Sequence, residues 1–422
     1  MRVLWLKTEL LHPIDKGGKI RTYNMLKELK RKHQITYLAL DDGSATADER
    51  HSAREYCHEF VPVPHSQVEK FTPRFYVDLA RNLASSSPYF MTKYQSPKMR
   101  QAIVDQVSRN GFDVLVCDFL MPSINVPKDL ECPTLLFQHN VEAMIWRRHY
   151  EVQTHPLKKA YFYNQWIKTR RFERDICRRF DQVATVSAHD RDTIAKDYQV
   201  GEVIDVPTGV DTDYFRPRGL ERQSPYNLVF TGSMDWLPNE DAIRYFTEHI
   251  IPLIKRQVPE VTLTVVGRNP SARLLDLTKL DSSIIVTGRV EDVRPYIERA
   301  AAFIVPLRIG GGTRLKIFEA MAMEKAVIST TIGAEGLPVR HEAEVLLADS
   351  PETFANTVVR VLRNPSLGND LGKRAANVVR QSFGWGPVAD SFARICEHTR
   401  YLSQQKKAAL SSVKVSKRLY EQ

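Results

Sequence analysis

The sequence predicts an α/β protein built from two doubly wound domains, and three observations lead to this prediction. Short apolar runs alternate with stretches of helical spacing, the pattern of parallel sheets that helices cover on both faces. The 422 residues are 43% hydrophobic, which is enough for two large cores at roughly 150 residues per domain. The alternation stops once, near 213–226, and then begins again.

The first domain is expected over residues 1–212. Its first forty residues form a βαβ unit: an apolar run at 3–6, a turn at 16–19, helical spacing over 20–32, and a β-branched run at 35–40. Further strands are predicted at 112–117, 134–138, 182–186 and 203–206, with helical stretches between them.

Residues 213–226 contain two prolines and a glycine but little apolar periodicity, so we expect a linker there. The second domain is expected over 227–382. Its strands are predicted at 227–231, 261–266, 283–287, 302–306, 326–330 and 345–347, and its helices at 239–257, 292–300, 313–323 and 351–363. A helix at 383–402 is expected to cross back to the first domain, followed by a polar tail at 403–422. Two such domains facing across a cleft bind ligands at the carboxyl ends of their strands.

Charge, cysteine content and the length of apolar runs narrow the possible partners and cellular location of the protein. The chain has 60 Lys and Arg against 50 Asp and Glu, and a net charge of +10 suggests nucleic acid, an anionic membrane surface or a phosphorylated small molecule as partner. Five scattered cysteines without zinc-ligand spacing favour neither disulfides nor a structural metal. No apolar run is long enough for a transmembrane helix or a signal peptide. We expect a cytoplasmic protein, either free or peripheral on the inner face of the membrane.

The strongest local feature is a glycine-rich loop that joins a predicted strand to a predicted helix. Glycine lets backbone N–H groups approach an anion, and the helix N-terminus adds partial positive charge. The loop contains Gly310, Gly311, Gly312 and the helix cap Thr313, with the cations Arg308, Arg314 and Lys316 around it. This combination predicts a diphosphate site, and Glu319, two helical turns on, can accept hydrogen bonds from a ribose diol. The alternative is an ordinary strand–helix turn with solvated cations.

These motifs resemble the retaining GT-B glycosyltransferases of the group-1 type, also called family 4. The form Gly-Gly-Gly-Thr-Arg-Leu-Lys-Ile-Phe-Glu-Ala-Met-Ala looks like a bacterial branch associated with exopolysaccharide and capsule genes. Other matches follow in the family's order: Gly17-Gly18, then segments at 137–142, 186–190, 207–211, 230–239, 266–267 and 288–289. The resemblance covers about residues 1–400 and is weaker over 45–110.

The resemblance implies two Rossmann-like domains and transfer of a hexose, with retention, from a nucleotide-sugar donor. The acceptor is a glycan or a lipid-linked molecule, in surface polysaccharide or glycoconjugate synthesis. The nucleotide diphosphate lies on the second domain, where Glu319 holds the ribose and the backbone of Arg289 and Val290 meets the base. Gly232, in the motif that opens that domain, is placed among the donor-binding residues.

For the first domain, the resemblance implies that Gly17 and Gly18 let a loop approach the phosphates or the acceptor. His139 reaches the donor sugar and is the predicted catalytic residue. The alternative for His139 is a strand-end histidine satisfied by its neighbours. Glu142 is expected to cap the following helix.

The sequence departs from the family pattern in two places. Many relatives carry two glutamates with seven residues between them, and Gly311 stands where the first is expected. The Arg and Lys usual on the loop that opens the second domain are replaced in a stretch containing Ser233, Asp235 and Asn239. A backbone N–H is expected to replace the glutamate, and Arg314 or Lys316 to supply the charge.

The family's favoured mechanism is front-face attack, in which the leaving diphosphate helps to remove the acceptor proton. It needs electrostatic stabilisation and positioning rather than an enzymic nucleophile. No carboxylate pair of glycosidase type stands out in the sequence. No cofactor and no metal are predicted, because Asp211 and Asp213 are expected to turn the chain rather than to bind one.

The stretch 147–179 holds ten cations and three carboxylates, a net +7, with aromatic and isoleucine residues between them from Tyr161 to Ile176. It is either a helix on an anionic membrane surface or a solvated helix whose apolar residues face its own domain. No nucleic-acid-binding signature accompanies the charge, so no nucleic acid is expected.

Two alternatives to a glycosyltransferase stay open. One is a sugar-nucleotide 2-epimerase of the same architecture, which needs acid and base carboxylates. The other is a non-catalytic nucleotide-sugar-binding protein, which the missing first glutamate leaves open and which release of nucleotide diphosphate on turnover would exclude.

Overall fold

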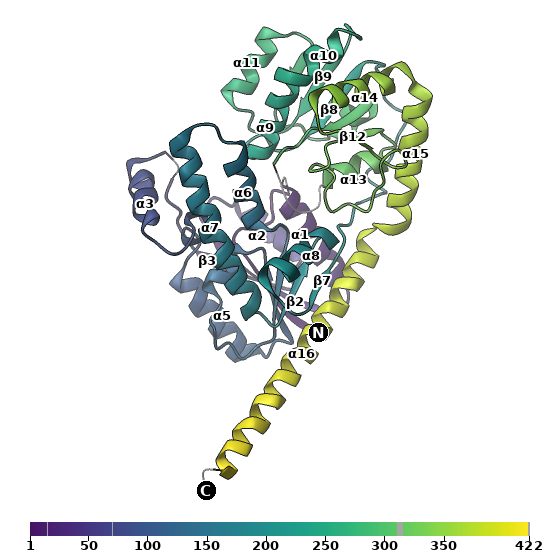
Figure 1. Ribbon diagram of the computed structural model, residues 1–422. Helices are drawn as coiled ribbons and strands as arrows, with labels where there is room; N and C mark the ends of the chain where they lie inside the picture. Colours follow the sequence, from purple (N-terminus) through teal and green to yellow (C-terminus); the bar gives the residue numbers. More distant parts are fainter. Residues whose placement is uncertain (15, 70, 310–314, 421–422) are drawn as a thin grey trace. The chain divides into compact units, whose positions relative to one another are not determined.

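The computed structural model describes residues 1–14, 16–69, 71–309 and 315–420, except for the side chains of 407 and 409–420. It divides into two compact units (Figure 1). Unit 1 contains Met1–Pro207 and the C-terminal helix from Gly386 onward, and unit 2 contains Thr208–Trp385. Each unit has a parallel sheet with helices packed against it, so the predicted fold class is confirmed.

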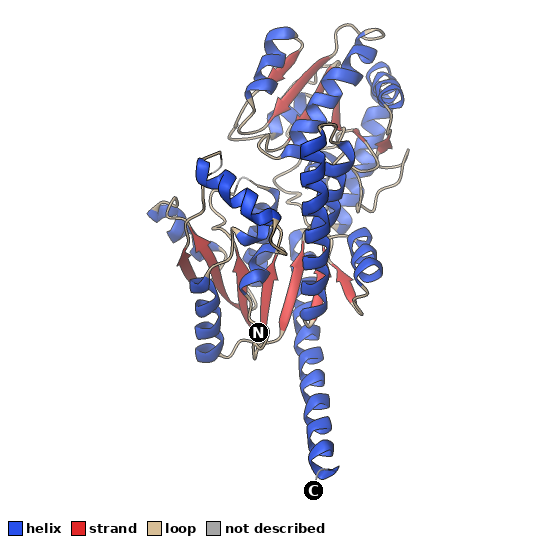
Figure 2. Cartoon of the chain, turned by 60° about the vertical axis from the view of Figure 1, so that its left-hand side comes forward, coloured by secondary structure: helices blue, strands red, loops and turns tan. Residues whose placement is uncertain are grey.

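The sheet of unit 1 has the strand order β3-β2-β1-β4-β5-β6-β7, and all its pairings are parallel (Figure 2). The strands are β1 (Arg2–Lys7), β2 (Gln34–Asp41), β3 (Glu59–Pro64), β4 (Val114–Asp118), β5 (Thr134–Gln138), β6 (Gln182–Thr185) and β7 (Val203–Asp205). The chain reverses its direction of travel across the sheet between β1 and β4. In such sheets ligands bind at this reversal, outside the carboxyl ends of the strands.

The helices of unit 1 connect these strands. They are α1 (Gly17–Leu29), α2 (Ala47–His51), η1 (Ser52–Glu55), α3 (Pro73–Leu83), α4 (Tyr89–Thr92), α5 (Pro97–Asn110), η2 (Met121–Asn125), α6 (Glu142–Val152), α7 (Pro156–Arg179) and α8 (Ala188–Tyr198). The predicted turn at 16–19 is wrong beyond Lys16, because α1 already begins at Gly17. The sequence did not predict β3, an edge strand that contains Pro62 and Pro64. An edge position tolerates proline because one side of the strand needs no N–H donors.

The sheet of unit 2 has the order β10-β9-β8-β11-β12-β13, again all parallel. Its strands are β8 (Asn227–Thr231), β9 (Thr262–Val266), β10 (Ile284–Val286), β11 (Ala302–Val305), β12 (Val327–Ser329) and β13 (Leu346–Leu347). All six lie within the predicted ranges. The reversal in this sheet falls between β8 and β11.

The helices of unit 2 are α9 (Leu237–Tyr245), the π-helix η3 (Phe246–Ile250), α10 (Ile251–Lys255), α11 (Ala272–Leu280), α12 (Arg294–Arg299), α13 (Leu315–Ala322), α14 (Pro351–Arg363) and α15 (Pro365–Ser382). The single helix predicted at 239–257 is therefore three segments. Pro252 lies at the start of α10, where it cannot donate to a preceding helical turn.

The predicted linker 213–226 contains no helix or strand, but it is packed on unit 2. The Glu298 carboxylate accepts hydrogen bonds from the N–H groups of Arg218 (2.8 Å) and Gly219 (2.6 Å), and Arg299 pairs with Glu221 at 2.7 Å. The boundary between the units therefore lies at Pro207, five residues before the predicted one, and the segment is bound to unit 2 rather than loose.

The chain ends in the long helix α16 (Trp385–Tyr420), which extends through most of the predicted polar tail. From Gly386 onward it belongs to unit 1, where Phe392 packs against Trp5 and Phe137 at ring-centroid distances of 5.4 and 4.8 Å. Within the described part of the chain, none of the helices combines the length and apolar character needed to cross a bilayer.

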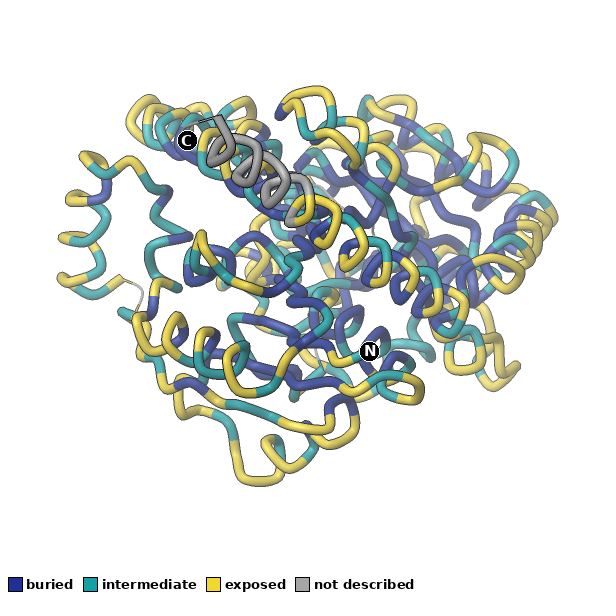
Figure 3. The backbone as a smooth tube through the Cα atoms, turned by 90° about the horizontal axis from the view of Figure 1, so that it is seen from below, coloured by how far each residue is buried: buried dark blue, intermediate teal, exposed yellow. Residues whose placement is uncertain are grey.

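The cores follow the alternation of the strands. In unit 2, Phe230 and Ile304 pack into the core on one face of the sheet, and Val229 and Phe303 into the core on the other. The central strands of each sheet are buried, whereas the edge strands β3 and β10 are partly exposed and the outer surfaces of the helices are exposed (Figure 3). Several buried polar side chains, among them Lys7, Asp118 and His139, lie at or just after strand ends, which is where a site can form.

Candidate functional site

A buried polar cluster centred on Asp118 lies at the carboxyl ends of three neighbouring strands of unit 1. Lys7 ends β1, Asp118 ends β4, and His139 directly follows β5. Asp118 Oδ2 accepts hydrogen bonds from Lys7 Nζ at 2.7 Å and from Thr22 Oγ1 at 2.6 Å. It also accepts one from Trp5 Nε1 at 3.0 Å, while His139 Nε2 lies 2.6 Å from Oδ1.

The charges of this cluster are paired without access to water. Lys7 and Asp118 are 3% and 0% exposed. The pKa of Asp118 lies well below its usual range: burial alone would raise it, but the charge of Lys7 and the pairing with His139 lower it by more. A buried ion pair of this kind is stable only when further hydrogen bonds satisfy the remaining lone pairs, as Trp5 and Thr22 do here.

His139 is held as a neutral imidazole. Burial lowers its pKa to about 3, although the nearby Asp118 acts in the opposite direction. An ionised carboxylate can only accept, so the ring proton lies on Nε2 and Nδ1 is presented as an acceptor. The ring also stacks on Phe119 at 3.8 Å between centroids. The structure thus shows the predicted catalytic histidine buried and oriented by its neighbours.

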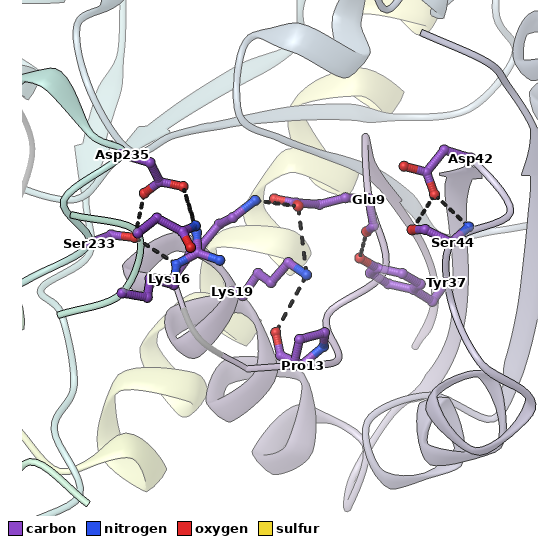
Figure 4. A network of polar contacts seen from close by, with 11 residues as sticks. Glu9, Pro13, Lys16, Lys19, Tyr37, Asp42, Ser44, Ser233 and Asp235 are labelled. Atoms are coloured by element: carbon purple, nitrogen blue, oxygen red, sulfur yellow. Dashed lines mark hydrogen bonds and ion pairs between the residues drawn. The ribbon is translucent and has the colours of Figure 1, made fainter. Parts of the chain in front are cut away.

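The glycine pair of the first domain lies at the start of α1, beside this cluster. A Cβ on Gly18 would lie 2.7 Å from Phe119 Cζ, so Gly18 permits the close packing of α1 on the ring that stacks with His139. Gly17 is exposed at the first position of the helix. Lys16 and Lys19 flank the pair, and both approach the Glu9 carboxylate, at 3.1 and 3.6 Å (Figure 4).

A second buried cation, Arg21, belongs to the same helix. Its side chain is nearly fully buried, and its Nε and Nη2 atoms have no hydrogen-bond partner among the described residues. Burial lowers its pKa to about 9, while the carboxylates of Asp118 and Asp190 act to raise it. Arg21 in turn lowers the pKa of His139 and so favours the neutral ring.

In unit 2, the residues at the sheet reversal come from both sides of it. Gly232 directly follows β8, Asn239 lies in α9, and Lys316 lies in α13, which follows β11. Lys316 Nζ donates to Asn239 Oδ1 at 2.9 Å, and Asn239 Nδ2 donates to the carbonyl of Ser233 at 2.8 Å. A Cβ on Gly232 would lie 2.6 Å from Lys316 Nζ and 2.8 Å from Asn239 Nδ2, so a larger residue here would require these two side chains to shift.

Two other sites of this region, the Arg308 side chain and the loop after β8, already form polar contacts within unit 2. Arg308 forms a bidentate ion pair with Asp241 of α9, at 3.1 and 2.6 Å, so its charge is largely neutralised. On the loop after β8, Ser233 Oγ donates to Asp235 at 2.6 Å (Figure 4). Arg268, which follows β9, donates to Ser233 Oγ at 2.7 Å and pairs with Asp235 at 3.3 Å. A guanidinium thus does reach this loop, although it comes from the neighbouring strand.

Glu319 lies one turn after Lys316 in α13, and burial raises its pKa to about 7 while Lys316 acts to lower it. Arg289 and Val290 follow β10, and Val290 packs against the core. The predicted residues Gly310, Gly311, Gly312, Thr313 and Arg314 lie outside the described residues.

Sequence reasoning missed several members of these clusters. Asp118 and Lys7 each end an apolar strand, and that position was an available signal. The sequence carries no such signal for Arg21, Arg268 and Asp241. Each of them meets the groups it interacts with only in the folded chain. The expected capping by Glu142 is wrong: the N–H groups at the start of α6 donate to Glu173 of α7 instead, at 2.9 and 3.0 Å. No group of three or more His, Cys, Asp or Glu residues in the described ranges is placed to hold a metal ion.

Solved structures share this architecture along nearly the whole chain. Sucrose-phosphate synthase from Thermosynechococcus elongatus aligns with a TM-score of 0.71 and 16% identity, over 97% of this chain and all of that one. Anabaena HepE, solved with UDP-glucose, aligns with a TM-score of 0.65 and 11% identity, over 94% of this chain and all of its own. Two parallel-sheet domains of this form define the GT-B class of fold.

Sequence comparison identifies the family. The model of Glycosyltransferase Family 4 matches residues 16–214, and the model of group 1 glycosyl transferases matches residues 225–364. An uncharacterized 44.6 kDa protein from a cps region of Klebsiella pneumoniae is 20% identical, over 90% of this chain and 96% of its own length. The chain belongs to the group-1 glycosyltransferases of GT-B fold, and it is a glycosyltransferase.

Proposed function

We propose that the protein transfers a hexose, with retention, from a nucleotide-sugar donor to a glycan or lipid-linked acceptor in surface polysaccharide or glycoconjugate synthesis. The observation that supports this best is the meeting of Gly232, Asn239 and Lys316 at the sheet reversal of unit 2, with Glu319 one turn further on. In open α/β sheets this is where a nucleotide binds. The HepE structure with UDP-glucose supports the choice of donor.

In this proposal Glu319 accepts hydrogen bonds from the ribose, and the backbone of Arg289 and Val290 meets the base. Lys316 and the 308–314 loop, with the N–H groups of Gly310, Gly311 and Gly312, bind the diphosphate together with Thr313 and Arg314. Arg308 takes part only if the phosphate competes with Asp241 for its guanidinium. The alternative of a plain turn with solvated cations does not account for the contacts of Lys316.

His139 contacts the donor sugar in this account. Its neutral ring presents Nδ1 as a hydrogen-bond acceptor, which suits a sugar hydroxyl better than a phosphate. Cations and backbone N–H groups stabilise the leaving diphosphate, which takes the acceptor proton during front-face attack. We propose that the reaction needs no metal or other cofactor, because these groups supply the required charge.

The place in surface polysaccharide synthesis rests on the loop motif and on the Klebsiella relative from a cps region. We propose that unit 1, with Gly17 and Gly18, holds the acceptor.

A membrane surface is a second proposed partner, and exposed apolar side chains on α3 and at the start of α7 favour it more than the cations of 147–179 alone do. In that stretch Lys168 donates to the carbonyl of Asn82 at 2.6 Å and Arg179 to that of Ser123 at 2.9 Å, so these two cations serve unit 1 itself. By contrast, α3, Phe71 just before it, and the first turn of α7 expose large apolar side chains with cations close in sequence. Phe71, Tyr76, Leu83 and Leu157 are 77%, 55%, 52% and 79% exposed, with Arg74, Arg81 and Lys158 exposed nearby in the chain. An anionic bilayer accommodates both kinds of side chain.

The proposed function is tested with a panel of UDP, GDP and ADP and their sugars. We expect one nucleotide diphosphate to raise the unfolding temperature with concentration. The corresponding nucleotide sugar should release that diphosphate only when an acceptor is present. Binding without release would favour a non-catalytic protein, and interconversion of two nucleotide sugars would favour the 2-epimerase. Co-flotation with anionic but not with neutral vesicles, lost in Leu157→Ser, tests the membrane surface.

A further inference from the structure

The carboxylate of Glu173, in the C-terminal half of α7, is fully buried and accepts four hydrogen bonds. Oε1 accepts from Gln138 Nε2 at 3.1 Å and from the N–H of Glu142 at 2.9 Å. Oε2 accepts from the N–H of Ala143 at 3.0 Å and from Tyr198 Oη at 2.7 Å. Three of these four donors flank the connection between β5 and α6, which carries His139: Gln138 ends β5, and Glu142 and Ala143 begin α6.

The two backbone donors have no acceptor within their own helix. Glu142 and Ala143 are the first two residues of α6, and N–H groups in the first turn of a helix have no acceptor within the helix. The N-cap residue, Val141, has no side-chain oxygen to offer them. Glu173 therefore caps α6 from another helix, and an anion at a helix N-terminus also interacts favourably with the helix dipole.

The donors at 138, 142 and 143 lie on both sides of His139. Asp118 fixes the ring of His139 through Nε2, whereas Glu173 fixes the backbone on which the ring is carried. We infer that Glu173 is a positioning residue for the transfer reaction, holding the β5–α6 connection so that His139 meets the donor sugar. This inference rests on the role of His139 in the proposed function.

Glutamate suits this task better than glutamine. Burial raises the pKa of Glu173 to about 7, while the hydrogen bonds from Tyr198, Ala143 and Glu142 act to lower it. The ionised carboxylate has two oxygens for the four donors. A carboxamide has one acceptor oxygen, and its N–H groups would face two of those donors, leaving them unsatisfied.

The test uses Glu173→Gln in the full-length protein, with Asp175→Asn as the matched control. Asp175 lies two residues further along the same helix with its side chain 67% exposed, so its replacement should leave turnover unchanged. We expect Glu173→Gln to lower kcat by about 10- to 100-fold, since a misplacement near 1 Å can cost that much. The dissociation constant for the nucleotide diphosphate should change less than about twofold, because the nucleotide contacts proposed above are all in unit 2.

A double-mutant cycle separates positioning from general damage to the fold. If Glu173 acts through His139, then adding Glu173→Gln to His139→Ala should change kcat by less than about twofold. An equal loss of kcat in both backgrounds would overturn the inference, and so would wild-type activity in Glu173→Gln. If the wild-type protein itself transfers no sugar, the proposed function fails rather than this inference.

A second variant serves if Glu173→Gln does not fold. Gln138→Met removes one of the donors that flank the His139 connection and leaves the buried carboxylate with three partners. We expect a smaller loss of kcat that likewise disappears in the His139→Ala background. Tyr198→Phe, which removes the donor outside the connection, should lower kcat less than Gln138→Met, and the reverse order would overturn the inference.

Discussion

Replacing Asp118 with asparagine should destabilise unit 1 by about 3–5 kcal/mol, the usual cost of breaking a buried ion pair by removing one partner. Asp118 Oδ2 lies 2.7 Å from Lys7 Nζ, and neither side chain has appreciable contact with water. The substitution therefore leaves an ammonium group buried without its counter-ion, and among the described residues Thr22 Oγ1, at 2.7 Å, is its one other hydrogen-bond acceptor.

The hydrogen bonds at Asp118 contribute to the same loss. Four donors, on Trp5, Lys7, Thr22 and His139, converge on two carboxylate oxygens. Asparagine offers one acceptor oxygen and directs N–H groups at the remaining donors, and each buried donor left unsatisfied costs about 1–3 kcal/mol. The net change stays near the ion-pair value because the side chains relax and these terms are not additive.

Urea unfolding of the wild type, Asp118→Asn, Lys7→Met and the double variant measures this coupling. The double variant should be more stable than the sum of the single losses by at least about 2 kcal/mol, because it no longer contains a lone buried charge. Asp129→Asn, at an exposed position, is the control and should change stability by less than about 0.5 kcal/mol.

The contribution of Asp118 to the free energy of unfolding should depend on pH. The pKa of Asp118 is lowered in the folded protein, so its contribution to stability is present above the pKa of the unfolded chain, about 3.9. It is lost as the pH falls through the folded value, and the difference between wild type and variant should be constant from pH 5 to 8. A loss below about 1 kcal/mol, or strict additivity with Lys7→Met, would refute the buried ion pair as the organising contact of this cluster.

Three further outcomes follow from the geometry. Gly18→Ala should lower the stability of unit 1 by about 1–3 kcal/mol, since the new Cβ would lie 2.7 Å from Phe119. The control Gly386→Ala, which has open space around the new Cβ, should leave the unfolding temperature unchanged in the same thermal unfolding experiment. The affinity for the nucleotide diphosphate should be constant above about pH 8 and fall by up to tenfold per pH unit below pH 7, because Glu319, with its pKa of about 7, becomes protonated. Calorimetric titration across this pH range measures the affinity, and an affinity that does not change with pH would contradict the prediction. Lys316→Met should weaken nucleotide diphosphate binding by about 10- to 100-fold and reduce its salt dependence, which the same titrations at two ionic strengths detect.

The sequence was most informative about the strands. All six strands of unit 2 could be predicted because β-branched apolar runs between turn residues have few other stable conformations in a buried sheet. Two elements gave weaker patterns: β3 contains Pro62 and Pro64, and α11 was not distinguished from a loop. Pro252 divided one predicted helix into three segments.

The candidate site was partly predictable for a related reason. Residues next to strand ends in a parallel sheet meet at one edge, so His139, Gly232 and Lys316 could be placed near the two reversals. The residues with which the side chains of the site form ion pairs and hydrogen bonds could not be predicted from the sequence. Arg308 pairs with Asp241 across 67 residues, and Glu173 reaches the His139 connection across about 30. Such pairings depend on how helices pack, which no local pattern encodes.

The central claim is that the sheet reversal of unit 2 binds a nucleotide diphosphate through Glu319 and Lys316. Calorimetric titration of the nucleotide diphosphate selected by the panel into the wild type and Glu319→Ala, at pH 8, tests this most directly. We expect saturable binding to the wild type and an affinity at least tenfold weaker in the variant, corresponding to about 1.4 kcal/mol or more for the hydrogen bonds to the ribose. Equal affinity in the two proteins, or no binding of any nucleotide diphosphate to the wild type, would contradict it.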